Sequence, residues 1–226
     1  MPDPQHLTFE EARVFGCLIE KSQATPEYYP LTLNAVMNAC NQKSSREPVV
    51  EFDEDTVDIA LDGLREKGLV AYSSGTGRTL KYMHRAGQNG LGMTPAEAAA
   101  MSIIILRGPQ TVGEIKARTA RQFNFTTLEQ VQDTLTHLSS AEKGLLEEAP
   151  RRGGQKEVRF RHRFFEWPAE SALPDEVTQQ TGELSPRERI ANLEARVLEL
   201  ERQNIALLAM LDELSKKMEW LTNELS

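Results

Sequence analysis

Residues 57–84 read VDIALDGLREKGLVAYSSGTGRTLKYMH. Within this stretch the spacing of the apolar residues changes from helical to alternating, and this change indicates the fold. Val57, Leu61 and Leu64 recur at helical spacing as far as Gly68, where the period changes to two. The alternating segments on either side of the following glycine-rich turn are typical of a β-hairpin. The stretch therefore predicts a buried helix that runs directly into a hairpin.

The same pattern occurs again in the second half of the chain. Val131, Leu135 and Leu138 keep the helical spacing, and residues 143–146 (KGLL) repeat residues 67–70 (KGLV). Two shorter helical patterns precede the long helix in each half. A unit of three helices and a hairpin is the layout of a winged helix, a helix-turn-helix variant. The duplication therefore predicts a tandem protein.

Polar residues mark where the helices begin. A threonine followed three residues later by a glutamate can form a capping box, and we expect such boxes at Thr8 with Glu11, Thr94 with Glu97, and Thr111 with Glu114. Asp53 and Thr127 open the third helix of each half, and we expect Leu128 to face inward with the apolar residues that follow it.

These patterns predict a mainly α protein with small β wings (α+β), in which two tandem winged-helix domains precede a C-terminal coiled-coil helix. The first domain is expected over residues 1–86 and the second over 87–166, followed by a linker at 167–184 and the coiled coil at 185–226. Separate capping boxes indicate two separate cores. We therefore expect a fragment from Met93 to Trp167 to fold alone.

The C-terminal segment carries five heptads. Two a positions carry β-branched residues, every d position carries leucine, and Asn204 is the single asparagine at an a position. This pattern favours a parallel two-stranded coiled coil. The sequence therefore predicts a parallel homodimer, with a tetramer or packing of the helix on the winged helices as alternatives. The predicted dimerisation residues are Ile190, Leu193, Val197, Leu200, Asn204, Leu207, Leu211, Leu214, Met218 and Leu221.

The net charge of −8 is distributed unevenly along the chain. Residues 1–86 carry 9 Lys and Arg against 13 Asp and Glu, residues 87–166 carry 11 against 9, and residues 167–226 carry 6 against 12. The second repeat is thus the only basic segment, which favours it as the part that contacts phosphates.

Basic residues of the second repeat gather in its second helix and in its hairpin. Val158, Phe160 and His162 alternate with three arginines, so these arginines are expected to project from one face of the strand. A solvated edge strand protected by charge is the alternative. The predicted nucleic-acid-binding residues are Lys116, Arg118, Arg121, Arg151, Arg152, Lys156, Arg159, Arg161 and Arg163.

The third helix of the first repeat and the third helix of the second repeat differ in the charge of their outward residues. In the first repeat this helix is acidic, with Asp55, Asp58 and Asp62, and phosphates repel such a surface. In the second repeat its outward residues are polar but include no arginine or lysine. Contact with the phosphate backbone is therefore better supported than the reading of base edges.

Catalytic and metal-binding patterns are absent from the sequence. The four histidines are scattered, and the glycines of residues 75–77 lack the lysine-serine ending of a P-loop. Cys17 and Cys40 are far apart in sequence and are expected in the core. We predict a protein that is not an enzyme and that has no cofactor and no metal. Without a long apolar run or a secretory pattern, it is expected to be cytoplasmic.

Two stretches resemble a known family. Residues 31–70, LTLNAVMNACNQKSSREPVVEFDEDTVDIALDGLREKGLV, and 93–115, MTPAEAAAMSIIILRGPQTVGEI, resemble the bacterial YceH-type family, and the similarity covers roughly residues 7 to 165. The resemblance implies tandem winged-helix domains in a cytoplasmic bacterial protein and supplies no catalytic residues. Residues 41–48, NQKSSREP, are polar, so we expect an interaction surface there and not core packing.

Two function classes remain. The leading hypothesis is a dimeric DNA-binding protein of transcription-factor type that contacts double-stranded DNA through its second domain. The alternative is an interaction scaffold, as in tandem winged-helix subunits of chromosome-condensing complexes, with the acidic first domain as the surface for another protein. Neither hypothesis requires a membrane.

Overall fold

The computed structural model describes residues 6–73, 80–87, 90–140, 142–150, 157–165 and 167. This part of the chain is mixed α/β, with six α-helices and two small antiparallel strand pairs, and it lies in one compact unit, Met1–Pro168. The predicted linker beyond Trp167 and the predicted coiled coil lie outside the described residues. None of the described helices is long and apolar enough to cross a membrane.

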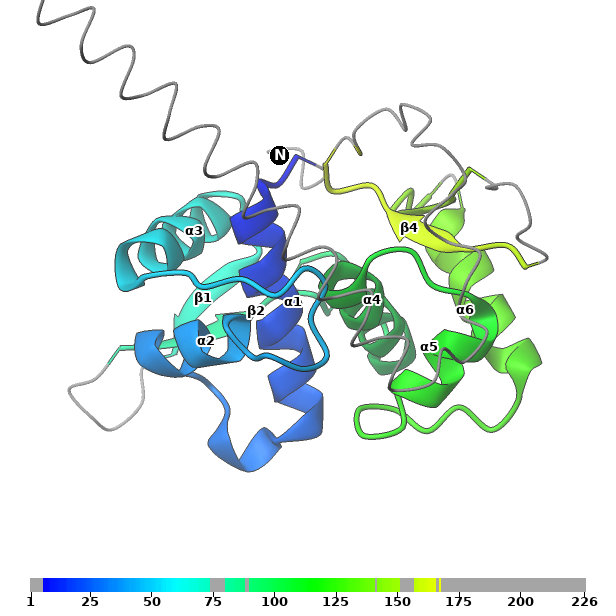
Figure 1. The fold of residues 1–226 in the computed structure, drawn as a ribbon, viewed down its shortest axis with the longest axis horizontal. Helices are drawn as coiled ribbons and strands as arrows, with labels where there is room; N and C mark the ends of the chain where they lie inside the picture. Colours follow the sequence, from blue (N-terminus) through cyan, green and yellow to red (C-terminus); the bar gives the residue numbers. More distant parts are fainter. Residues whose placement is uncertain are drawn as a thin grey trace, which may run out of the picture. The chain divides into compact units, whose positions relative to one another are not determined.

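Each half of the unit contains three helices followed by a hairpin (Figure 1). The first half consists of α1 (Phe9–Ala24), the short 3-10 helix η1 (Pro26–Tyr28), α2 (Leu33–Cys40), α3 (Glu54–Glu66), β1 (Val70–Ser73) and β2 (Lys81–His84). The second consists of α4 (Pro95–Arg107), α5 (Val112–Arg118), α6 (Leu128–Ser139), β3 (Leu146–Glu148) and β4 (Phe160–His162).

The strand pairing repeats as well. Strand β1 pairs antiparallel with β2, and β3 pairs antiparallel with β4. One residue just before the second helix of each half adds a bridge to the returning strand: Leu31 pairs with Tyr82, and Gln110 pairs with Phe160. Each half therefore has its own third extended segment, which pairs with the returning strand of its hairpin.

The predicted helix starts are confirmed by their hydrogen bonds. All three capping boxes are present in full, and the side chains of Asp53 and Thr127 accept from backbone groups of α3 and α6. Gly68 and Gly144 follow the third helices with φ of 74° and 59°, a conformation that favours glycine. The repeated Lys-Gly pair thus turns the chain from helix towards strand in both halves.

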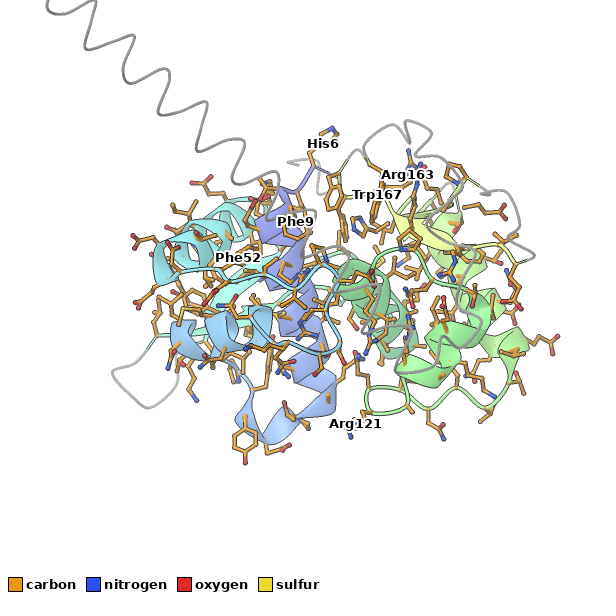
Figure 2. All side chains as sticks on the ribbon, viewed as in Figure 1. His6, Phe9, Phe52, Arg121, Arg163 and Trp167 are labelled. Carbon is orange, nitrogen blue, oxygen red and sulfur yellow. The ribbon has the colours of Figure 1, made fainter. Side chains whose placement is uncertain are left out.

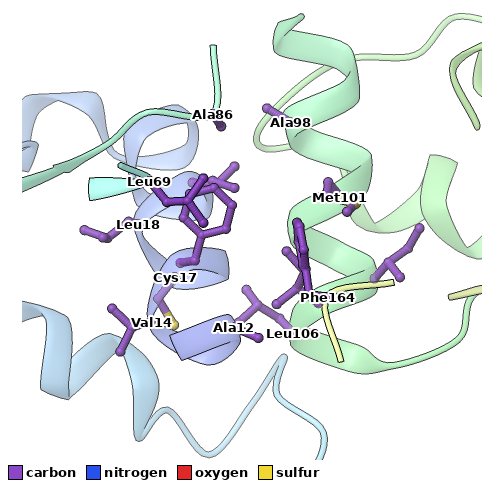
Figure 3. Packing of buried hydrophobic residues seen from close by; sticks show 14 of the residues in the cluster. Ala12, Val14, Cys17, Leu18, Leu69, Ala86, Ala98, Met101, Leu106 and Phe164 are labelled. Carbon is purple, nitrogen blue, oxygen red and sulfur yellow. The ribbon is translucent and has the colours of Figure 1, made fainter. Parts of the chain in front are cut away.

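The expectation of two separate cores is wrong. Side chains are buried without interruption from Glu11 to Ile19 in α1 and from Glu97 to Leu106 in α4, and the core residues of both halves form one cluster. The two helices lie side by side in the middle of the unit (Figures 1 and 3). A Cβ atom added at Gly16 would lie 2.8 Å from a methyl group of Ile105, so the helices approach closely there.

Two further expectations need correction. Leu128 is 54% exposed, because it stands in the first turn of α6 before the apolar stripe reaches the core. The loop at residues 41–48 is partly interior: Arg46 is buried, Asn41 exchanges hydrogen bonds of 2.7 and 2.8 Å with the backbone of Phe52, and the Glu47 N–H donates to Leu106 (2.8 Å). Its polar residues therefore satisfy buried backbone groups.

Candidate nucleic-acid interface

Helix α5 presents the first predicted phosphate contacts. Its capping box holds the N-terminus, with the Glu114 N–H donating to Thr111 (3.2 Å) and the Thr111 N–H donating to Glu114 (2.9 Å). Ile115 is buried and anchors the helix on the core. Lys116 follows this anchor in the sequence and lines an open depression beside the helix. Local capping and a single apolar contact thus orient this short helix.

An open depression lies between α5 and the segment that leads to α6. Lys116 and small residues of α5 and its C-terminal turn line one side, and two polar residues and one phenylalanine line the other. The lining residues are Gly113, Lys116, Ala117, Ala120, Asn124, Phe125 and Thr126. Small side chains leave the backbone accessible, which suits a phosphate group better than a bulky apolar ligand.

Lys116 and Arg121 have no carboxylate partner among the described residues, and Arg121 projects outward from the turn after α5 (Figure 2). Arg118 is different, because its guanidinium donates to the Gln110 side chain and lies 3.9 Å from Glu114. Of the three basic residues predicted here, two are therefore free to bind an external anion.

The strand arginines alternate with inward-facing residues as predicted, but each has an acidic partner. Arg159 donates to both carboxylate oxygens of Glu114, at 2.8 and 3.2 Å. Arg161 donates to Glu147 at 2.7 Å, and the Arg163 Nε lies 3.6 Å from the same carboxylate. These three arginines tie β4 to α5 and β3. Sequence reasoning missed the pairing because Glu114 is distant in the chain.

The carboxylate of Glu114 is the centre of this network. Burial raises the pKa of Glu114, but hydrogen bonds from Thr111 and Arg159 outweigh it, so the pKa is lowered overall. The ionised form therefore persists at neutral pH and keeps Arg159 occupied. The remaining predicted contacts, Arg151, Arg152 and Lys156, lie outside the described residues.

Comparison with known proteins identifies the family. Residues 7–155 match the family described as "Protein of unknown function, DUF480". The chain belongs to this family. It is 47% identical over 198 residues to a UPF0502 protein of Solibacter usitatus, covering 87% of this chain and 93% of that protein. It is 42% identical over 214 residues to a UPF0502 protein of a Shewanella strain, covering 92% and 97%.

The matched segment includes α5 and the depression, whereas the strand arginines lie beyond residue 155. The family is described as one of unknown function, which is consistent with the YceH-type resemblance in the sequence. No group of three or more His, Cys, Asp or Glu residues in the described segments is arranged to hold a metal ion.

The third helix of the second repeat offers a polar outer face. Gln132, Asp133, Thr136 and His137 are exposed, and the His137 ring forms a close contact with Glu97. Gln130 is half-buried, and its side chain accepts from the Thr126 N–H at 3.0 Å. This face carries no arginine or lysine, so it lacks the side chains that most often recognise guanine.

The third helix of the first repeat presents an acidic face, as predicted. Asp55, Asp58 and Asp62 are exposed, and Ile59 between them is 73% exposed. Asp53 caps the helix by accepting from the Thr56 N–H at 2.9 Å, and hydrogen bonding to Thr56 lowers the pKa of Asp53. Phosphates are repelled from this face, so α3 is unsuited to DNA.

A buried histidine makes the unit sensitive to acid. Burial lowers the pKa of His162 to about 3, and Arg161 contributes to the decrease. Because an unfolded histidine has a pKa of about 6.5, the unfolded chain gains a proton below pH 6.5 that the folded chain does not. This group therefore lowers the free energy of unfolding as pH falls from about 6.5 towards 3.

Acidification from pH 7 to pH 5 is expected to cost about 2 kcal/mol of stability through His162 alone. His84 adds to the loss, because burial lowers its pKa to about 4. Replacing His162 with glutamine removes one of the two contributions, so the pH dependence of urea unfolding becomes shallower. If the wild type and His162→Gln lose stability in parallel between pH 7 and pH 5, His162 is not buried in its neutral form.

Proposed function

We propose that the two repeats are tandem winged helices and that this is a non-enzymatic DNA-binding protein of transcription-regulator type. The second repeat contacts phosphates through α5, the turn after it and the tip of its hairpin. The observation that carries the proposal is the pair of unneutralised cations at α5: Lys116 lines the depression, and Arg121 projects from the turn after the helix. In this proposal Arg159, Arg161 and Arg163 are assigned to holding β4 against α5 and β3, because each is paired with Glu114 or Glu147.

The depression suits a phosphodiester backbone for three reasons. Lys116 supplies a positive charge in its lining, and Asn124 and Thr126 supply polar groups. Gly113 and Ala117 have small side chains that leave room for a phosphate group beside the helix. Backbone phosphate contacts of this kind position a protein on DNA without reading sequence. The polar face of α6 is compatible with this mode, because it adds no strong base-reading pair.

A titration of labelled duplex DNA at several salt concentrations tests the proposal. If Lys116 and Arg121 neutralise two phosphates and the hairpin tip neutralises two more, the logarithm of affinity falls with the logarithm of salt at a slope of about −3.6 per protomer. The corresponding loss of affinity from 50 to 200 mM salt is about 100-fold. Failure of the wild type to bind duplex at low salt would exclude this function.

The proposed assembly is a parallel homodimer through the heptads of residues 187–226. Its support is the sequence pattern, in which Asn204 at an a position favours two strands in register. Sedimentation of the full chain is expected to give a dimer, and a chain lacking residues 187–226 is expected to give folded monomer. If both chains sediment as the same oligomer, another surface holds the assembly together.

A second candidate function is an interaction scaffold that binds protein through the first repeat. Ile59 favours it, because a large apolar side chain 73% exposed among aspartates is a suitable anchor for a basic partner segment. Exposed apolar side chains in single positions are common, so this observation supports a proposal of lower priority. It becomes the leading one if the duplex titration shows no binding.

A further inference from the structure

Leu128 is an exposed apolar side chain at the first position of α6. The side chain of Thr127 before it accepts from the Gln130 N–H at 3.1 Å, and the buried Val131 anchors the first turn on the core. The turn is therefore held in place, and Leu128 keeps its outward position. A single exposed apolar residue is common on protein surfaces, so the surroundings of Leu128 decide its role.

The exposed side chains of α6 form two rows, because residues four apart share one face of a helix. The first row is Leu128, Gln132 and Thr136, and the second is Glu129, Asp133 and His137. The second row ends at the close contact between His137 and Glu97 of α4. In the first row, the amide of Gln132 has no hydrogen-bond partner among the described residues. Its donor and acceptor groups are therefore available to another molecule.

The start of α6 adjoins the depression beside α5. Thr126, two residues before Leu128, lines this depression together with Lys116. Helices α5 and α6 pack against each other (Figure 1). In helix-turn-helix proteins the first helix of the motif contacts the DNA backbone, and the N-terminal residues of the second reach base edges in the major groove. With a phosphate at Lys116, Leu128 occupies the position of a base contact.

The chemistry of the first row matches an A·T base pair. Thymine presents a methyl group in the major groove, and an apolar side chain that covers this methyl removes it from water. The amide of Gln132, one turn after Leu128, has the donor and acceptor that pair with N7 and N6 of adenine. Guanine is read mainly by arginine and lysine, and α6 contains neither.

We propose that α6 prefers A·T base pairs, with Leu128 against a thymine methyl group and Gln132 against adenine. This inference rests on the proposed DNA-binding function and names the base pair that the same interface recognises. The second row offers the opposite preference, because carboxylates accept from the amino group of cytosine. Glu129 and Asp133 are repelled by phosphates, however, so the first row is the one that suits the groove.

Short alternating duplexes test the assignment without a known binding site, because each contains either A·T pairs or G·C pairs throughout. The full-length protein is titrated at low salt with an alternating adenine–thymine duplex, with the same duplex carrying deoxyuridine for thymidine, and with an alternating guanine–cytosine duplex. Deoxyuridine lacks only the methyl group. The thymine duplex is expected to bind about 4-fold more tightly than the uracil duplex. It is expected to bind about 10-fold more tightly than the guanine–cytosine duplex.

Three variants assign the preference to its side chains. Leu128→Ala is expected to bind the thymine and uracil duplexes with equal affinity, because little is left to cover the methyl group. Gln132→Ala is expected to keep the preference for thymine over uracil and to lose most of the preference over guanine–cytosine. The matched control is Ile59→Ala, which removes an exposed apolar side chain from α3 and is expected to keep both preferences.

The outcomes separate this inference from the function on which it rests. Equal, salt-dependent binding of the wild type to all three duplexes leaves the phosphate contacts in place and overturns the base assignment alone. Tighter binding to the guanine–cytosine duplex, or a thymine preference that survives in Leu128→Ala, also overturns it. Absence of binding to every duplex overturns the DNA-binding function and the base assignment together.

Discussion

A fragment of residues 93–167 is expected to lose cooperative unfolding once the first repeat is removed. Helix α4 is buried on all sides, and α1 covers one of them, with Gly16 against Ile105 and Leu106. Phe15 of α1 packs edge-on against Phe164, with ring centroids 6.1 Å apart. Exposing roughly five large apolar side chains costs on the order of 10 kcal/mol, which equals the whole stability of a typical domain.

Circular dichroism during heating measures this effect. The control fragment, residues 6–167, contains both repeats without the predicted coiled coil and is expected to melt in one cooperative transition. The fragment of residues 93–167 is expected to show a broad transition or none. A sharp transition in the shorter fragment would show that the second repeat has an independent core, as the sequence pattern alone suggested.

The local features of the fold are accessible from sequence because they depend on residues close together in the chain. The capping boxes at Thr8, Thr94 and Thr111 link residues three apart, and all three form. The change of period after Gly68 depends only on neighbouring residues, and strand β1 begins where it predicts. Local chemistry thus determined the element order of both repeats.

The shared core has a signal in the sequence of α4. Residues 98–106 of α4 read AAAMSIIIL, which is apolar around the whole helix and not along one stripe. A helix of this kind must be covered on every side. One three-helix repeat cannot provide that cover, so a second repeat packed against it was the physical consequence.

Pairings across long stretches of chain could not be predicted in the same way. Arg159 donates to Glu114 because the chain returns at β4 beside the start of α5. Arg46, in the loop after α2, is directed into the protein, where it donates to Glu20 of α1. A basic strand and a polar loop look identical in sequence whether their charges face solvent or a buried partner. The correct set of free cations therefore follows only from the fold.

Reversing the two free charges of the second repeat is expected to weaken DNA binding strongly. Lys116→Glu with Arg121→Glu removes two of about four phosphate contacts, so the salt slope falls from about −3.6 to about −1.8. Affinity at 50 mM salt is expected to fall about 100-fold, because the new carboxylates also repel phosphate. Neither side chain has an intramolecular ion pair among the described residues, so folding is expected to be unaffected.

The matched control reverses two exposed charges of the first repeat, Lys43→Glu with Arg85→Glu, and changes the net charge by the same amount. The most direct measurement is the duplex titration of the wild type and both double variants, from 50 to 200 mM salt. The proposed interface predicts that the control keeps the wild-type slope, whereas the Lys116 and Arg121 variant loses about half of it. Equal slopes in the two variants would contradict DNA binding through α5 and its turn.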